Sequence, residues 1–413
     1  MIDPRVAYEA HLDNRADAMG ALCVHGGERH DPSTMALDPP LVLASAFAFE
    51  SADAAAKAFR GENDAYIYGR WRTPPVEVLE AKLAALEGAE TACATASGMA
   101  AISGAVMTLA KGAGGHVVAP RAMYAESARL LRERLPAFGI RTTFVDDPTP
   151  EAYAAAMSEE TRLLYVETPA NPNLRITDVR AIAKLARDRG VASLADNTFA
   201  SPFSQNPIAL GIDVVVHSTT KSIGGHGDAI GGVVCGPRAI VDPVREFVVK
   251  GMGAVLAPMN AFLVTRGVRT LALRQRQANA TAAYLAKVLS EHPKIAVVHH
   301  PSLPDHPGHA LANDQMMAYG SVLAFEVKAT SGRPALEAGR SVLESVRVAT
   351  HAVSLGDVKT LVVHPASTTH STMPADDRKR AHVTDGLLRM SVGIEPKKAL
   401  LDDLLRALDA LGA

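Results

Sequence analysis

The chain has 413 residues, and its 42 Lys and Arg nearly balance its 44 Asp and Glu, which leaves a net charge of −2 at pH 7. Apolar residues make up 48% and charged residues 21%, a balance that excludes a disordered linker and indicates a globular protein of about two or three domains. Without a basic excess, and with only 5% aromatic residues, the chain is not expected to bind nucleic acid.

The sequence also argues against a secreted or membrane protein. Residues 1–15 carry several charges and lack the apolar core of a signal peptide, and no apolar run approaches the roughly 18 residues of a membrane span. The three cysteines, Cys23, Cys93 and Cys235, are scattered and odd in number, which is typical of reduced thiols. We therefore expect a cytoplasmic protein with no membrane partner.

The positions of proline and glycine residues, together with the apolar spacing, predict that the chain forms an N-terminal arm and two domains. Prolines at 32, 39 and 40 predict an irregular N-terminal arm over residues 1–60. From residue 76 apolar residues recur at helical spacing up to Gly88, which opens a large domain over residues 61–257. A long helical pattern at 262–289 and apolar runs at 322–327, 346–353 and 388–394 predict a smaller α/β domain over residues 258–413.

Within the large domain, short apolar strands alternate with amphipathic helices. The predicted strands are 117–118, 141–145, 163–166, 191–195 and 213–216, and the clearest helices begin near residues 97 and 178. This alternation predicts βαβ units and a mainly parallel sheet, whose ligands bind at the carboxyl ends of the strands. Polar residues stand at those ends, namely Glu167, Asn171, Asp196, Asn197, His217 and Ser218.

Lys221 follows one of these strands in a glycine-rich turn, after the hydroxyl residues Ser218 and Thr220. Burial disfavours the ammonium form of a lysine and makes its amine usable in chemistry, and the two hydroxyls suit phosphate oxygens. An exposed lysine in a glycine loop is an equally acceptable interpretation of this segment alone.

Two further features have both a functional and a structural interpretation. Asp196 ends an apolar strand, where its carboxylate suits a protonated heterocycle nitrogen, but Asn-Thr follows it, so it also suits a helix N-cap. Gly98 and Met99 open a helix whose free amides suit an anion, although simple capping by Ser97 is the commoner use of such a segment.

Taken together, a phosphate site, a strand-end lysine and a strand-end aspartate predict pyridoxal phosphate (PLP) as the cofactor, with Lys221 forming the Schiff base. Other chemistries fit less well, because the chain has no GxGxxG after a strand, no P-loop, no HExxH and no GxSxG. The histidines at 299, 300, 306 and 309 lie in a proline-rich segment without acidic partners, so we expect no metal site.

From about Leu22 to the C-terminus the chain resembles the Cys/Met-metabolism family of PLP enzymes, which includes methionine γ-lyase, cystathionine γ-synthase, cystathionine γ-lyase and homoserine-ester sulfhydrylases. The segments that carry the resemblance are Tyr68-Gly69-Arg70, Ser97-Gly98-Met99, Tyr124, residues 167–172, residues 195–198, residues 217–221, residues 354–357, residues 364–367 and residues 389–393. The resemblance implies a fold-type I PLP enzyme, and a homotetramer built from two active dimers.

The resemblance also implies roles for individual residues. Lys221 resembles the Schiff-base lysine that shuttles protons, and Asp196 resembles the partner of the pyridinium nitrogen. Ser218, Thr220 and the backbone of Gly98 and Met99 resemble phosphate ligands, and Tyr68 and Arg70 resemble the pair that reaches the phosphate of the adjacent subunit. Tyr124 resembles the tyrosine that stacks on the cofactor and donates a proton. To act first as a base, its phenol needs a cationic neighbour that lowers its pKa, and Arg70 and the substrate ammonium are the candidates. Asn171, Ser354 and Arg389 resemble the groups around the cofactor hydroxyl and the substrate carboxylate.

Departures from the family pattern bear on the substrate. Glu126 stands where the methionine γ-lyase branch carries cysteine, and a carboxylate there favours a cationic γ-substituent such as that of canavanine. The alternative is that Glu126 turns away and pairs with Arg129 or Arg132 on its own helix. The branch signals are mixed, because Gly227-Asp228 is similar to the lyases and residues 365–370 are similar to the sulfhydrylases.

Three functions follow from these residues. The first is a lyase that carries out γ-elimination on an L-amino acid of the methionine, homocysteine or homoserine type, giving a 2-oxo acid and ammonia. The second is a transferase that uses the same intermediate for γ-replacement, as O-acyl-homoserine sulfhydrylase or cystathionine γ-synthase does. The third, a non-catalytic scaffold with a decayed site, is disfavoured because Lys221, Asp196, Tyr124 and Arg389 are all present.

Overall fold

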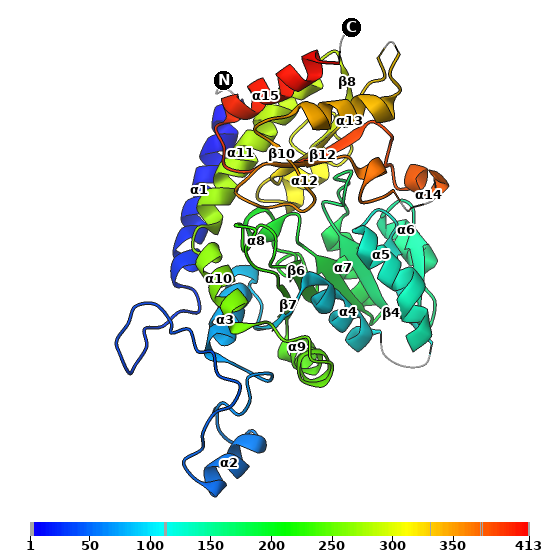
Figure 1. Ribbon diagram of the computed structural model, residues 1–413. Helices are drawn as coiled ribbons and strands as arrows, with labels where there is room; N and C mark the ends of the chain where they lie inside the picture. The colour runs from blue at the N-terminus through cyan, green and yellow to red at the C-terminus, as the bar shows by residue number, and fades with distance from the viewer. Residues whose placement is uncertain (1–3, 111–113, 331, 372, 374, 412–413) are drawn as a thin grey trace.

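A computed structural model describes residues 4–110, 114–330, 332–371, 373 and 375–411. Two β-sheets, each with its own helices, form the body of the molecule (Figure 1). The segment of residues 26–73, called the arm below, carries α2 and projects away from the body. None of the helices in the described ranges combines the length and the hydropathy needed to cross a membrane.

The larger sheet has the strand order β1-β7-β6-β5-β4-β2-β3. Its strands are β1 (Thr91–Thr95), β2 (Gly115–Pro120), β3 (Ile140–Val145), β4 (Thr161–Glu167), β5 (Ala192–Asp196), β6 (Val214–Ser218) and β7 (Gly232–Gly236). The ladders from β3 through β6 are parallel, whereas β7 pairs antiparallel with both β6 and β1. The predicted mainly parallel sheet is therefore confirmed, and β1 and β7 are strands that the sequence analysis did not predict.

Helices cover both faces of this sheet. They are α3 (Pro74–Glu87), α4 (Gly98–Leu109), α5 (Ala125–Arg129), α6 (Pro150–Ala156), α7 (Val179–Asp188), α8 (Ser201–Ser204), α9 (Arg238–Val244) and α10 (Pro258–Val268), with the short turns η1 (Leu130–Arg134), η2 (Leu135–Phe138) and η3 (Arg245–Gly251). Consecutive strand residues face opposite sides, so Val215 packs in one apolar cluster while Val214 and Val216 pack in the other. A sheet buried on both faces leaves its strand ends as the place for polar groups.

Local signals explain where several of these helices begin and end. The Ser97 hydroxyl caps α4 by accepting from the amide of Ala100, and Asp178 caps α7 in the same way through Ala181. Gly88 ends α3 with a φ of 69°, in the left-handed region that glycine tolerates best.

The N-terminal segment differs from the expected irregular arm. Residues 4–25 form the helix α1 (Pro4–His25), which lies along α11 (Figure 1), and α2 (Ala52–Phe59) lies further out. Leu12, Met19 and Cys23 of α1 are buried, at a spacing that places them on one helical face. The prolines that suggested an irregular arm begin only at Pro32, after this helix has ended.

The smaller sheet has the order β10-β11-β12-β9-β8 and is mostly antiparallel. Its elements are α11 (Leu271–Ser290), β8 (Ile295–His299), α12 (His309–Gln315), β9 (Val322–Val327), α13 (Ala335–Ser345), β10 (Thr350–His351), β11 (Leu361–Val363), η4 (Pro365–Ser367), α14 (Ala375–Arg380), β12 (Leu387–Ser391) and α15 (Lys397–Asp409). Together the two sheets confirm the predicted α/β fold with a large and a smaller part.

Two element predictions in this half need correction. The long helix expected over 262–289 is two helices, α10 and α11, which are separated at Arg269 and Thr270. The strand expected over 346–353 is reduced to the two residues of β10, because the Asp403 carboxylate accepts the amides of residues 347, 348 and 349. Amides engaged by a side chain are not available to a neighbouring strand.

The predicted domain boundaries at 60/61 and 257/258 remain predictions. Apolar residues of α10, such as Ala261 and Val264, belong to the core of the larger sheet, whereas the core of the smaller sheet begins at Ala282 within α11.

Candidate active site

The carboxyl ends of three neighbouring strands bring the candidate residues together. Glu167 ends β4, Asp196 ends β5 and Ser218 ends β6. Glu167 lies opposite Asp196 in the β4–β5 ladder, and Asp196 lies opposite Val216 in the β5–β6 ladder. Since parallel strands end at one edge, residues far apart in the sequence meet there.

Lys221 lies in the turn that follows β6, where its amide donates to the Ser218 carbonyl at 3.2 Å. Its Nζ donates to the Ser354 hydroxyl at 2.7 Å. Burial, with a further contribution from the charge of Arg389, lowers the pKa of the Lys221 amine from 10.5 to about 8. The interpretation of Lys221 as an exposed loop lysine is therefore wrong.

Asp196 is a buried carboxylate with spare capacity to accept hydrogen bonds. Its Oδ1 accepts the amide of Thr198 at 3.0 Å, and its Oδ2 has a long contact of 3.5 Å with the Tyr165 hydroxyl. Burial raises its pKa, and the bonds from Thr198 and the charge of His217 oppose that rise. It does not cap a helix, because the N-cap of the following helix α8 is Ala200.

The N-terminus of α4 packs directly against the end of β6. A Cβ placed on Gly98 would lie 2.6 Å from the Ser218 Cβ, so only glycine allows this approach. The first amides of a helix have no partner within the helix, which leaves those of Gly98 and Met99 for an anion beside Ser218. Capping by Ser97 does not exclude an anion, because the Ser97 hydroxyl accepts from the amide of Ala100 and not from those of Gly98 and Met99. The Thr220 hydroxyl, in contrast, already donates to the carbonyl of Gly231 and accepts from its amide.

Arg389 joins the two sheets at this edge. It lies on β12, and its Nη1 donates to the Asn171 side-chain oxygen at 3.1 Å while its Nη2 donates to the Ser354 carbonyl at 2.8 Å. The side chain is buried, and burial lowers the pKa of its guanidinium to about 10. Its buried Nε has no hydrogen-bond partner among the described residues.

Tyr124 precedes α5, and its amide donates to the Glu167 Oε2 at 2.9 Å. Burial and the charges of Glu126 and Glu167 raise the pKa of its phenol, and Arg389 is the cation that opposes this rise. The expected lowering of this pKa by Arg70 is not found within the chain. Tyr124 therefore stays protonated at neutral pH and is ready to donate a proton.

Glu126 is exposed on α5, close enough to Tyr124 for its charge to act on the phenol. The two arginines proposed as its alternative partners both bind Glu133, since Arg129 Nε donates to Glu133 Oε2 at 3.1 Å and Arg132 donates to Oε1 at 3.3 Å. The alternative in which Glu126 is neutralised on its own helix is therefore not supported.

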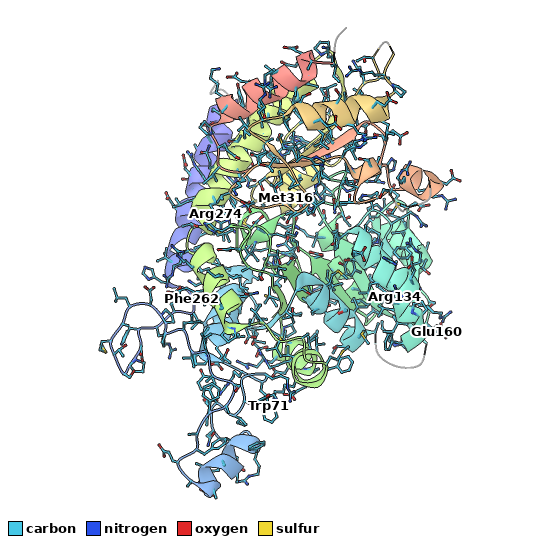
Figure 2. All side chains as sticks on the ribbon, in the orientation of Figure 1. Trp71, Arg134, Glu160, Phe262, Arg274 and Met316 are labelled. Atoms are coloured by element: carbon cyan, nitrogen blue, oxygen red, sulfur yellow. The ribbon has the colours of Figure 1, made fainter. Side chains whose placement is uncertain are left out.

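Tyr68 and Arg70 lie on the arm, and the contacts of Arg70 lead away from the strand ends. The Arg70 guanidinium donates to the Lys250 carbonyl of η3 and stacks over the Tyr68 ring. Figure 2 places nearby Trp71 on the arm below the larger sheet, where Lys250 lies over its ring. Within one chain, this pair does not join the group around Lys221.

Sequence reasoning missed the support beneath Asp196. His217 Nε2 lies 2.5 Å from Glu87 Oε1, and both side chains are buried. Asn197 donates to the same carboxylate oxygen at 3.1 Å, so α3, β5 and β6 are joined below the site. Glu87 lies 130 residues before His217, and no local pattern in the sequence relates them.

The histidine-rich segment is engaged in ordinary structural contacts. His299 bonds Glu326, His300 bonds Ser302, and His309 bonds the Pro301 carbonyl. Over the described ranges, the structure brings together no group of three His, Cys, Asp or Glu side chains that suits a metal ion.

A family model described as Cys/Met metabolism PLP-dependent enzyme matches residues 20–409. The chain belongs to this family. L-methionine gamma-lyase of Fusobacterium nucleatum subsp. polymorphum is 41% identical over 403 residues, covering 97% of this chain and 100% of that protein. O-succinylhomoserine sulfhydrylase of Pseudomonas aeruginosa is 37% identical, covering 97% of each chain. The solved cystathionine gamma-lyase from Lactobacillus plantarum has a TM-score of 0.87 and 35% identity, covering 95% of this chain and 98% of that one.

The residues of this Cys/Met-metabolism enzyme fit the PLP that the family uses. The α4 amides beside Ser218 suit its phosphate, and the spare acceptor capacity of buried Asp196 suits a protonated ring nitrogen. The unpartnered Nε of Arg389 suits an anionic group bound beside the cofactor.

The pKa of Lys221 leads to a prediction for the cofactor-free protein. Attachment of the Lys221 amine to added PLP needs the neutral amine, whose fraction grows as the pH rises through about 8. We expect the initial rate of appearance of the visible band to rise steeply between pH 7 and pH 9. Stopped-flow absorbance across that range measures it, and a midpoint near 10.5, the ordinary value for lysine, would contradict the prediction.

Proposed function

We propose that the enzyme catalyses γ-elimination on a γ-substituted L-amino acid of the methionine type, releasing a 2-oxo acid, ammonia and the γ-leaving group. The observation that carries the proposal is the partly neutral Lys221 amine, held by Ser354 beside the Arg389 cation. The relatives named L-methionine gamma-lyase, at 37% to 41% identity over nearly the whole chain, support this choice of reaction.

In this proposal the amides of Gly98 and Met99, with Ser218 and the turn containing Thr220, hold the cofactor phosphate. Asp196 binds the ring nitrogen, and Tyr124 covers the ring. When bound there, PLP draws electrons from the α-carbon of the substrate and so makes the adjacent protons acidic.

The chain's own groups then orient the substrate and move its protons. Arg389 binds the α-carboxylate, since a guanidinium suits a carboxylate and its Nε has no partner among the described residues. The Lys221 amine, which is neutral at mildly alkaline pH, takes the α-proton and returns it to the bound substrate and cofactor. Neutral again, it then takes a β-proton. Tyr124, whose raised pKa keeps its hydroxyl protonated, donates a proton to the departing sulfur or oxygen.

A product assay tests elimination against replacement. Methionine, homocysteine, cystathionine, O-acyl-homoserines and canavanine are each supplied with and without an added thiol, and 2-oxo acid, ammonia and new thioether are quantified. We expect 2-oxo acid and ammonia without thiol. A requirement for thiol, with thioether as the product, would instead favour γ-replacement, the activity suggested by the name of the sulfhydrylase relative.

Glu126 supports a second candidate, a γ-lyase for a cationic substrate such as canavanine. Glu126 is exposed near Tyr124, and the neighbouring arginines are bound to Glu133 instead. We expect Glu126→Gln to lower the ratio of kcat/KM for canavanine to kcat/KM for methionine by about threefold to fivefold, which corresponds to the roughly 1 kcal/mol of an exposed ion pair. Glu151→Gln, at an exposed glutamate in the first turn of α6, is the matched control. An unchanged ratio in Glu126→Gln would remove this candidate.

We further propose that the active unit is a dimer within a homotetramer, and that Tyr68 and Arg70 serve the phosphate of the adjacent subunit. The arm projects from the body (Figure 1) and exposes Leu37, Leu43 and Phe59, at 88%, 66% and 63%. The mass in solution tests the assembly, and a monomer would contradict it. A cytoplasmic location is also proposed, supported by the buried free thiols of Cys23, Cys93 and Cys235.

A further inference from the structure

Glu167 has a carboxylate at a buried strand end, where burial of a charged group is unfavourable for the free energy of folding. It is only 3% exposed at the end of β4, on the same face as Tyr165 and opposite Asp196 in the ladder. Burying a charged group costs several kcal/mol unless hydrogen bonds compensate. Burial and the nearby Asp196 both raise the pKa of Glu167, so overall stability does not explain a carboxylate here.

The contacts of Glu167 instead join two loops of the candidate site. Its Oε2 accepts the amide of Tyr124 at 2.9 Å, and its Oε1 accepts the amide of Asn171 at 3.1 Å. Tyr124 lies after β2, whereas Asn171 lies after β4, so the two loops come from different strands. A single rigid side chain at a strand end therefore fixes the main chain of both.

From Asn171 the hydrogen bonds continue to the lysine. The Asn171 side chain accepts from Arg389, Arg389 donates to the Ser354 carbonyl, and the Ser354 hydroxyl accepts from Lys221 Nζ. A shift of the Asn171 loop is thus passed to the group that binds the substrate carboxylate. Glu167 begins this series of hydrogen bonds through its Oε1, which accepts the Asn171 amide, while its Oε2 accepts the Tyr124 amide.

We infer that Glu167 is a positioning residue for the reaction, which sets Tyr124 over the cofactor and Asn171 against Arg389 through its two amide contacts. The inference rests on the proposed function. Glutamate is needed because both of its oxygens accept, whereas glutamine would present an NH₂ group to one of the two amides and lose that contact.

The test compares Glu167→Gln and Glu167→Asp with Glu160→Gln. The first removes one acceptor without changing size, and the second keeps both acceptors but shortens their reach. The control makes the same substitution at exposed Glu160, which directly precedes the opposite end of β4 and is labelled in Figure 2. Its carboxylate contacts Arg141. Each variant is also made in a Tyr124→Phe background.

We expect both Glu167 variants to lose about 10- to 100-fold in kcat, the effect of misplacing a reacting group by about 1 Å. In the Tyr124→Phe background the further loss in kcat should be smaller than in wild type. The part that passes through Tyr124 is already gone there, whereas the part that passes through Asn171 to Arg389 remains. The Glu160 control should stay within twofold of wild type on every measure.

Two readouts do not depend on turnover. We expect the Glu167 variants to bind PLP several-fold more weakly in equilibrium dialysis, and to show a weaker visible circular dichroism band per bound cofactor.

If wild type binds no PLP, the proposed function fails. If wild type binds PLP and turns over substrate, the inference alone is overturned when either Glu167 variant keeps kcat within twofold of wild type, or when its loss is fully additive with Tyr124→Phe. If Glu167→Gln fails to fold, Glu167→Asp carries the same comparison.

Discussion

Replacement of Lys221 by alanine is expected to reduce turnover by at least about 10³-fold, since one positioned proton-transfer group alone contributes roughly 10²- to 10⁴-fold. The substitution removes the amine whose pKa the site lowers to about 8, and the Ser354 hydroxyl then loses the donor that it accepts from at 2.7 Å. No other group among the contacts of Ser354 supplies an amine in its place.

Steady-state kinetics and mass spectrometry after borohydride reduction measure this effect. In wild type the reduced cofactor should be fixed to the peptide that contains Lys221, and in the alanine variant no peptide should carry it. Lys184→Ala is the control, because Lys184 is an exposed residue of α7 paired with Asp188. Retention of full activity, or labelling of another lysine in wild type, would refute the assignment of Lys221.

Replacement of Arg389 by lysine should lower kcat/KM by roughly 30- to 3000-fold, which corresponds to the 2–5 kcal/mol lost when one partner of a buried charge pair is removed. A lysine carries the charge but cannot contact Asn171, Ser354 and a carboxylate from one planar group. The loss should fall mainly on KM, because the carboxylate is bound in the ground state as well as in the transition state.

The preference for a free carboxylate tests the same residue more sharply. Wild type should discriminate strongly between an amino acid and its carboxamide, whereas Arg389→Lys should discriminate weakly. Arg129→Lys is the control, since Arg129 is exposed and binds Glu133. Equal discrimination in wild type and in the Arg389 variant would show that another group binds the carboxylate.

Much of the larger sheet could be predicted because its signals are local. The helices α4 and α7 begin at side chains that cap them, and α3 ends at a glycine with positive φ. Apolar runs bounded by turns identified β4, β5 and β6, and parallel pairing brings their polar ends to one edge. The sequence could therefore predict that Asp196, Ser218 and Lys221 lie at one edge of the sheet, and their roles there remain predictions.

Predictions failed where a distant partner outweighed the local pattern. The run at 346–353 has the composition of a strand, yet Asp403 of α15 accepts three of its amides and leaves only β10. Asp403 is a residue that no short window around this run contains. The helical pattern at 262–289 also breaks at Arg269 and Thr270, and the apolar spacing does not reveal that division.

By itself, the sequence determined that this chain forms an α/β enzyme of the Cys/Met-metabolism family, with an amine and a carboxylate at neighbouring strand ends. These features can be predicted from the sequence because strand periodicity, helix caps and the polar residues at strand ends all depend on residues that are close together in the chain. Only the tertiary structure decided that Glu167 holds both Tyr124 and Asn171, and that Arg389 contacts Asn171 across 218 residues. Such contacts form only after the two sheets pack, because packing and not sequence proximity brings their donors and acceptors within reach.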